Sequence, residues 1–302
     1  MNTSITAQTP RLHFPALLSL SLTARVSDIV DIMQSISFPN ATGVYLNCDD
    51  GGSMSEHRTS FHAMYSAFPM SLRRLHIELR VDTLQQKEPA RLRPGALNFD
   101  TFVRPLQSLR DLRELKLDVQ LGEHIDGFLE LRNGDLRSLV PAWPRLSFFE
   151  YSIQWSQHYL RIARPALGRD HPTLDTVFAF ARAHPHLLHL QLPYVRTDPL
   201  PEDPTPLEEA TRPLEGHGLL WLKVGRPPGR RKDSAYLAPI VRAVDRAFPR
   251  LYEEVQRDRT SSIYPRWSFL EKELCSLHGG EYKDNEATRL VFRTAAVDLH
   301  AE

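Results

Sequence analysis

The chain has 302 residues, and its 37 basic and 37 acidic side chains give a net charge of +0. This balance excludes binding to nucleic acid or anionic lipid that is driven mainly by charge, because such binding needs a strong positive field. Apolar residues make up 41% of the chain, enough to bury a core, and the length predicts two domains or an extended repeat. The only two cysteines, Cys48 and Cys275, are too few for a disulfide scaffold, and we interpret Cys48 as a packed thiol.

The amino-terminal region lacks the pattern of a secretory signal, which combines a basic start with about 7–15 apolar residues. Residues 1–10 are polar, and Pro15, Ser19 and Ser21 interrupt the apolar stretch that follows. No run approaches the roughly 20 apolar residues of a membrane helix. We therefore expect a cytoplasmic or nuclear protein without a membrane partner, with residues 1–11 as a disordered segment.

Six segments show the apolar spacing i, i+3, i+4, i+7, which predicts a helix with one buried face. Proline follows closely after several of them, as at Phe38–Pro39 and Phe68–Pro69, and ends the helix because it lacks an amide donor. In chain order the stripes are Val26, Ile29, Val30, Met33; Phe61, Met64, Tyr65, Phe68; Phe99, Phe102, Val103, Leu106; Leu136, Leu139, Val140, Trp143; Leu174, Val177, Phe178, Ala181; and Leu237, Ile240, Val241, Val244.

Between these stripes the apolar residues alternate with polar ones, which predicts short strands with one buried face. The expected inward positions are Leu17, Leu20, Leu22; Val44, Leu46; Leu72, Leu75, Ile77, Leu79; Leu112, Leu115, Leu117; Leu146, Phe149, Tyr151; Leu187, Leu190, Leu192; and Leu219, Leu222, Val224.

Strands that alternate with helices predict a parallel sheet with right-handed crossovers. In a doubly wound sheet both strand faces are apolar, whereas here the second face carries charged residues such as Arg74, Glu114, Lys116 and Asp118. Burying such groups unpaired costs several kcal/mol each, so we expect this face in water. The predicted fold is therefore an α/β solenoid, or horseshoe, with parallel strands on the concave face and helices on the convex face.

The motif Leu-x-x-Leu-x-Leu followed by a helix, as at Leu112–Leu117 and Leu187–Leu192, resembles the leucine-rich repeat. The last inward strand positions, Leu22 to Val224, lie 24 to 41 residues apart, so the repeat is degenerate. With Phe-Pro-x-Leu entering strands, as at Phe14–Leu17, the chain resembles the substrate-side region of fungal F-box/leucine-rich-repeat proteins. The F-box itself is not visible, and the chain is expected to start inside a repeat at Phe14.

The resemblance covers about residues 12–250, which we expect to form the degenerate solenoid. Within it, residues 197–216 contain five prolines and an excess of acids, which predicts an exposed insertion. Beyond residue 250 the strand pattern fails, and we expect residues 251–302 to form a carboxyl-terminal capping region.

The polar strand face is the candidate binding surface, because aromatic rings spaced on a polar, concave surface are typical of interaction hot spots. The alternative is that inserted loops or residues 197–216 cover these rings within the same chain. The candidate partner-binding residues are Tyr45, Asn47, His76, Glu78, Lys116, Phe148, Glu150, His189, Gln191, Trp221 and Lys223.

A second candidate is the acidic turn from Asp49 to His57, which follows a strand end and offers Asp49, Asp50 and His57 to a metal or small molecule. A plain turn explains the same residues through their backbone freedom. The histidines at 184–189 are interpreted as structural or surface groups. Known phosphate-binding, nucleophile and metalloprotease motifs are absent, so we expect neither an enzyme nor a cofactor.

The predicted function is a protein–protein interaction module that binds an unidentified partner protein on the strand face. If an F-box is supplied elsewhere, the resemblance implies substrate recognition for an SCF-type ubiquitin ligase, with a Skp1-type adaptor as a second partner. The alternative is an enzyme, or a small-molecule or metal binder, that uses the turn at Asp49–His57.

Overall fold

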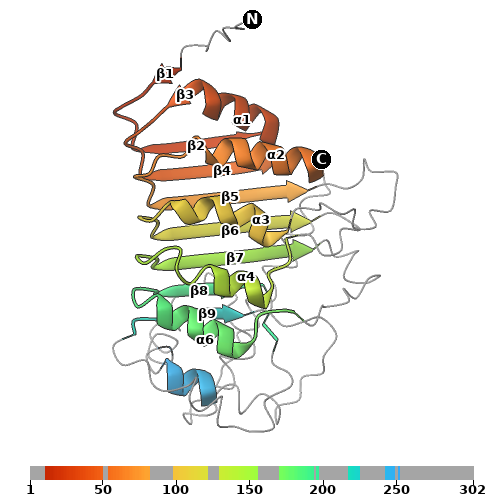
Figure 1. Ribbon diagram of the computed structural model, residues 1–302, viewed down its shortest axis with the longest axis vertical. Helices are drawn as coiled ribbons and strands as arrows, with labels where there is room; N and C mark the ends of the chain where they lie inside the picture. The colour runs from red at the N-terminus through yellow and green to blue at the C-terminus, as the bar shows by residue number, and fades with distance from the viewer. Residues whose placement is uncertain are drawn as a thin grey trace, which may run out of the picture.

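The computed structural model describes residues 11–49, 54–81, 98–121, 129–155, 170–193, 195–196, 217–224, 242–248 and 251. Seven strands in these ranges form one sheet in which every neighbouring pair is parallel. The strands are β2 (Ser19–Ala24), β4 (Gly43–Asp49), β5 (Arg74–Val81), β6 (Glu114–Leu121), β7 (Phe148–Trp155), β8 (His189–Leu192) and β9 (Trp221–Val224). Their spatial order is their chain order, so each crossover leads to the adjacent strand (Figure 1).

Helices alternate with the strands and cover one side of the sheet, as Figure 1 shows. They are α1 (Val26–Ser35), α2 (Met54–Tyr65), α3 (Phe99–Val103), the 3-10 helix η1 (Arg104–Ser108), α4 (Asn133–Ser138) and α6 (Leu174–Ala183). Residues 242–247 are also helical. The prediction of an α/β fold with an all-parallel sheet is confirmed. No helix in the described ranges has the length and apolarity needed to cross a membrane.

Local sequence explains where the shorter helices begin. Asn98 precedes α3, and its side chain accepts a hydrogen bond from the amide of Thr101 at 2.7 Å. At α4 the carboxylate of Asp135 accepts from the amide of Arg132 at 2.8 Å. Each contact satisfies an amide that has no partner within the helix, which fixes the first turn.

The predicted helix through Leu136 and Trp143 is shorter than its apolar spacing suggested. α4 ends at Ser138, although Leu139 and Trp143 are fully buried beyond it. Pro141 explains the difference, because its ring would clash with the carbonyl four residues earlier and it disfavours helical backbone at Val140. The apolar spacing therefore identified the buried residues but not the helix end.

The core lies between the sheet and the helices. The predicted inward positions of β4 to β8 are buried and belong to one hydrophobic cluster with the helix stripes. The inward positions of the first strand, Leu17, Leu20 and Leu22, are only half-buried, because β2 is an edge strand with one neighbour in this sheet. Two buried polar atoms tie the core to its connections: Trp143 Nε1 donates to the Leu106 carbonyl at 3.0 Å, and the Tyr151 hydroxyl donates to the Leu129 carbonyl.

A second, two-stranded parallel sheet joins β1 (Leu12–His13) to β3 (Ile36–Ser37). The sequence analysis did not predict it, because two residues are too few to show an alternating pattern. The predicted insertion at 197–216 and the predicted capping region beyond Leu251 lie outside the described residues. So do the amino-terminal residues 1–10.

Candidate functional site

The candidate site is the outer face of the sheet, defined as the strand positions that alternate with the buried ones and point away from the helices. The parallel register places these positions side by side in rows across the strands. One row runs through Gly43, Arg74, Glu114, Phe148, His189 and Trp221; the next through Tyr45, His76, Lys116, Glu150, Gln191 and Lys223; and the third through Asn47, Glu78, Asp118 and Ser152. The eleven predicted binding residues therefore all lie on one face, in three adjacent rows.

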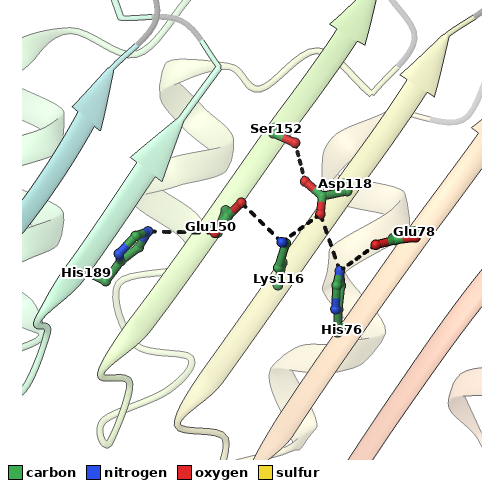
Figure 2. A network of polar contacts seen from close by, with 7 residues as sticks. All are labelled: His76, Glu78, Lys116, Asp118, Glu150, Ser152 and His189. Carbon is green, nitrogen blue, oxygen red and sulfur yellow. Dashed lines mark hydrogen bonds and ion pairs between the residues drawn. The ribbon is translucent and has the colours of Figure 1, made fainter. Parts of the chain in front are cut away.

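A network of polar contacts occupies the middle of this face (Figure 2). Asp118 is its centre: Lys116 Nζ lies 3.1 Å from Asp118 Oδ2, and the Ser152 hydroxyl donates to Asp118 Oδ1. His76 Nε2 lies 3.3 Å from the same Asp118 Oδ2 and 3.4 Å from Glu78 Oε1. We call His76, Glu78, Lys116, Asp118, Glu150, Ser152 and His189, the residues drawn in Figure 2, the polar network.

Asp118 is held as a carboxylate although it is buried. Burial alone would raise the pKa of Asp118, but hydrogen bonds from His76 and Ser152, with the charge of Lys116, outweigh it and lower the pKa. The residue is only 8% exposed, which differs from the expectation that charges on this face lie in water. The reason is mutual pairing, since each charged or polar neighbour replaces contacts that water would otherwise make.

Lys116 links two acids on neighbouring strands. Its Nζ lies 3.5 Å from Glu150 Oε1 in addition to its contact with Asp118. Burial lowers the pKa of Lys116, but the two carboxylates outweigh that effect and raise it. Burial raises the pKa of Glu150, and the nearby charge of Asp118 adds to this while Lys116 opposes it.

Three rings stack across β7, β8 and β9. The Phe148 and His189 rings have centroids 4.1 Å apart at 15°, and the His189 and Trp221 rings have centroids 5.4 Å apart at 8°. Burial, with the charges of Lys223 and Lys116, lowers the pKa of His189 to about 4. His189 is therefore neutral at pH 7, and its Nε2 contact of 3.7 Å with Glu150 Oε2 is not an ion pair at that pH. We call Phe148, His189 and Trp221 the ring stack.

Sequence reasoning missed part of the polar network. Asp118 was expected on the outer face but was not among the candidate binding residues, and Ser152 was not considered. The strand pattern contained a signal that these side chains lie together. Glu78, Asp118 and Ser152 each come directly after an inward-pointing residue, which is the last or the last but one of its strand. Aligning the strands on those residues places the three side chains in one row, as the register does.

The structure does not assemble the predicted acidic turn into a ligand set from the residues that it describes. Asp49, the last residue of β4, faces Arg80, with 3.3 Å between Asp49 Oδ1 and Arg80 Nη1. Residues 50–53 lie outside the described ranges, and His57 lies on α2 with its side chain outside them. Cys48 is buried, as expected of a packed thiol.

The polar network also contains a set of metal-ligand atoms that the sequence analysis did not foresee. Among the described residues, His76, Glu78 and Asp118 each offer one such atom, and these atoms lie within 4.8 Å of one another. The predicted histidine segment behaves differently: His184 is buried and donates from Nδ1 to the Phe180 carbonyl at 2.7 Å, while His189 belongs to the ring stack.

No model of a known protein family matches the chain, and no curated protein sequence matches it. A functional proposal for this chain therefore rests on the geometry of the outer face.

Proposed function

We propose that the chain is a protein-interaction module that binds a partner protein across the outer face of its sheet. In this proposal the sheet is the strand layer of a degenerate leucine-rich-repeat solenoid, with the outer face concave. The observation that carries the proposal is the ring stack, a continuous aromatic surface on a face whose other side chains are mostly polar.

The ring stack suits binding because its rings are already ordered. Phe148 and Trp221 are half-buried, and His189 lies between them with its side chain 20% exposed. A partner that covers these rings removes rigid apolar area from water without first having to order it. Because His189 is neutral at pH 7, the stack favours apolar or aromatic partner side chains.

The polar network supplies specificity beside the ring stack. Its charges are held by contacts within the sheet, so they present a fixed pattern to a partner rather than mobile side chains. Lys223, an exposed cation next to the stack, offers an additional contact for an acidic group. Fixed charges of this kind select between partners more than they raise affinity.

The test is affinity capture of the tagged full chain from its native cells, read by mass spectrometry, beside the Phe148→Ala/Trp221→Ala variant. We expect a partner captured by the wild-type chain to be lost by the variant, with a Kd about 30-fold or more higher when the purified pair is measured. The matched control is Gln120→Ala/Gln154→Ala, which removes two exposed outer-face residues away from the ring stack and should retain the partner.

Equal capture by the Phe148→Ala/Trp221→Ala variant, with unchanged far-ultraviolet circular dichroism, would contradict binding at this face. Recovery of a Skp1-type adaptor and a cullin would support the narrower proposal of substrate recognition for an SCF-type ubiquitin ligase. Recovery of other proteins, lost in the variant, would support an interaction module that works without that adaptor.

A further inference from the structure

Three side chains of the polar network have the spacing of metal ligands. His76 Nε2 lies 3.4 Å from Glu78 Oε1 and 3.3 Å from Asp118 Oδ2, and all three ligand atoms lie within 4.8 Å of one another. Around a tetrahedral zinc ion with bonds of about 2.0–2.1 Å, neighbouring ligand atoms are roughly 3.3 Å apart. Two of the three separations therefore already match such a site. We propose that His76, Glu78 and Asp118 bind a divalent transition-metal ion of the zinc class.

The backbone holds these ligands in place. His76 and Glu78 are two residues apart on β5 and so share the outer face, and Glu78 is the register partner of Asp118 on β6. Both strands have hydrogen-bonded neighbours on each side. Since both lie inside the sheet, the positions of the three Cα atoms are fixed before any ion arrives.

Neighbouring side chains orient two of the ligands. The Ser152 hydroxyl holds Asp118 Oδ1, which leaves Oδ2 directed at His76. The Tyr45 ring packs edge-on against the His76 ring, with centroids 4.6 Å apart at 77°. Such outer contacts fix ligand orientation in metal sites and commonly change metal affinity by about 10–100-fold.

Lys116 competes with a metal ion for the carboxylate of Asp118. Its Nζ lies 3.1 Å from Asp118 Oδ2, so this ammonium and a metal ion compete for that same carboxylate oxygen. Glu150 Oε1, 3.5 Å away, offers Lys116 a second acceptor on the other side. Metal binding therefore exchanges one cation for another at Asp118 and leaves Lys116 paired with Glu150.

The donor set defines the class of ion. One imidazole and two carboxylates suit zinc and its neighbours, whereas Ca²⁺ and Mg²⁺ prefer oxygen ligands in larger number. Coordination through His76 Nε2 requires its lone pair, so the Nε2 proton moves to Nδ1 or is released to solvent. Three protein ligands leave a fourth position for water or for a donor from a bound molecule.

The test is titration of the chelator-treated full chain with Co²⁺, followed by the visible absorption of tetrahedral Co²⁺, and then displacement by Zn²⁺. We expect His76→Gln and Asp118→Asn to lower the affinity by about tenfold or more. Lys116→Met should raise it, because the competing ammonium is gone. The matched control is His186→Gln, which removes an exposed histidine outside the polar network and the ring stack and should leave the affinity unchanged.

Circular dichroism and thermal unfolding without metal check that each variant folds. If His76→Gln does not fold, Lys116→Met still tests the proposal, since it is expected to raise the metal affinity rather than lower it. The proposal is overturned if the wild-type chain gives no tetrahedral Co²⁺ spectrum. It is also overturned if His76→Gln binds as well as wild type, or if Lys116→Met does not strengthen binding. Because the probe is the metal alone, these results do not depend on the partner proposed above.

Discussion

Replacing Trp143 with alanine should lower the free energy of unfolding by about 3–5 kcal/mol, the largest effect that we expect from one substitution. Trp143 lies in the connection from α4 to β7, where its side chain is fully buried and its ring packs against Phe149 with centroids 6.4 Å apart. Its Nε1 donates to the carbonyl of Leu106 on η1, 37 residues earlier. Alanine would leave a large cavity and remove one of two donors to the Leu106 carbonyl, which also accepts from the Leu109 amide at 3.0 Å.

Chemical denaturation followed by circular dichroism measures this loss. Trp143→Phe separates its two causes, because it keeps much of the ring volume and removes the hydrogen bond to Leu106, and should cost about 1–3 kcal/mol. The control is Met70→Ala, since Met70 is 64% exposed and its loss should change stability by about 0.5 kcal/mol or less. A loss below about 1 kcal/mol for Trp143→Ala would show that the indole does not hold the connection after α4 to η1.

The strands of the sheet could be predicted from the sequence because each strand carries its own alternation of apolar and polar residues. Leu115 and Leu117, for example, alternate with Glu114 and Lys116. This alternation lies within one strand, so it can be recognised without knowing which strands are neighbours. Element ends were harder. The spacing of Leu136, Leu139 and Trp143 was correct for burial, but Pro141 stops the helix before that spacing is complete.

The polar network was harder to predict because it depends on register between strands. Its contacts between strands join residues 34 to 42 positions apart, such as Asp118 with Ser152 and His76 with Asp118. Sequence patterns place each side chain on a face, whereas a contact needs the relative shift of two strands as well. The expected solvation of these charges was wrong for Asp118 for the same reason, since two of its partners, His76 and Ser152, lie on other strands.

Lowering the pH from about 6.5 to about 4 should destabilise the folded chain through His189. Burial, with the charges of Lys223 and Lys116, lowers the pKa of His189 from 6.5 to about 4 in the folded state. The unfolded state therefore takes up this proton first as the pH falls, and stability is lost across that window. One pKa unit corresponds to about 1.4 kcal/mol, so the loss from His189 is up to about 3 kcal/mol.

Other groups titrate nearby, so the measured quantity is a difference between proteins. Burial lowers the pKa of His184, which acts in the same direction, and burial raises the pKa of Glu150, whose protonation adds stability as the pH falls. Both groups remain in His189→Phe, which keeps a ring in the stack and removes the titrating group. The drop in unfolding free energy between pH 7 and pH 4 should be smaller in His189→Phe than in wild type.

Lys223→Gln tests the cause of the His189 shift. The ammonium of Lys223 opposes a positive charge on His189, so its removal should bring the pKa of His189 closer to 6.5 and reduce the stability lost at low pH. The nuclear magnetic resonance titration of His189 measures that change directly. An acid-induced loss that is identical in wild type and His189→Phe would mean that His189 accepts a proton as readily in the folded chain as in the unfolded one. The ring stack would then be cationic at mildly acidic pH and would no longer favour an apolar partner there.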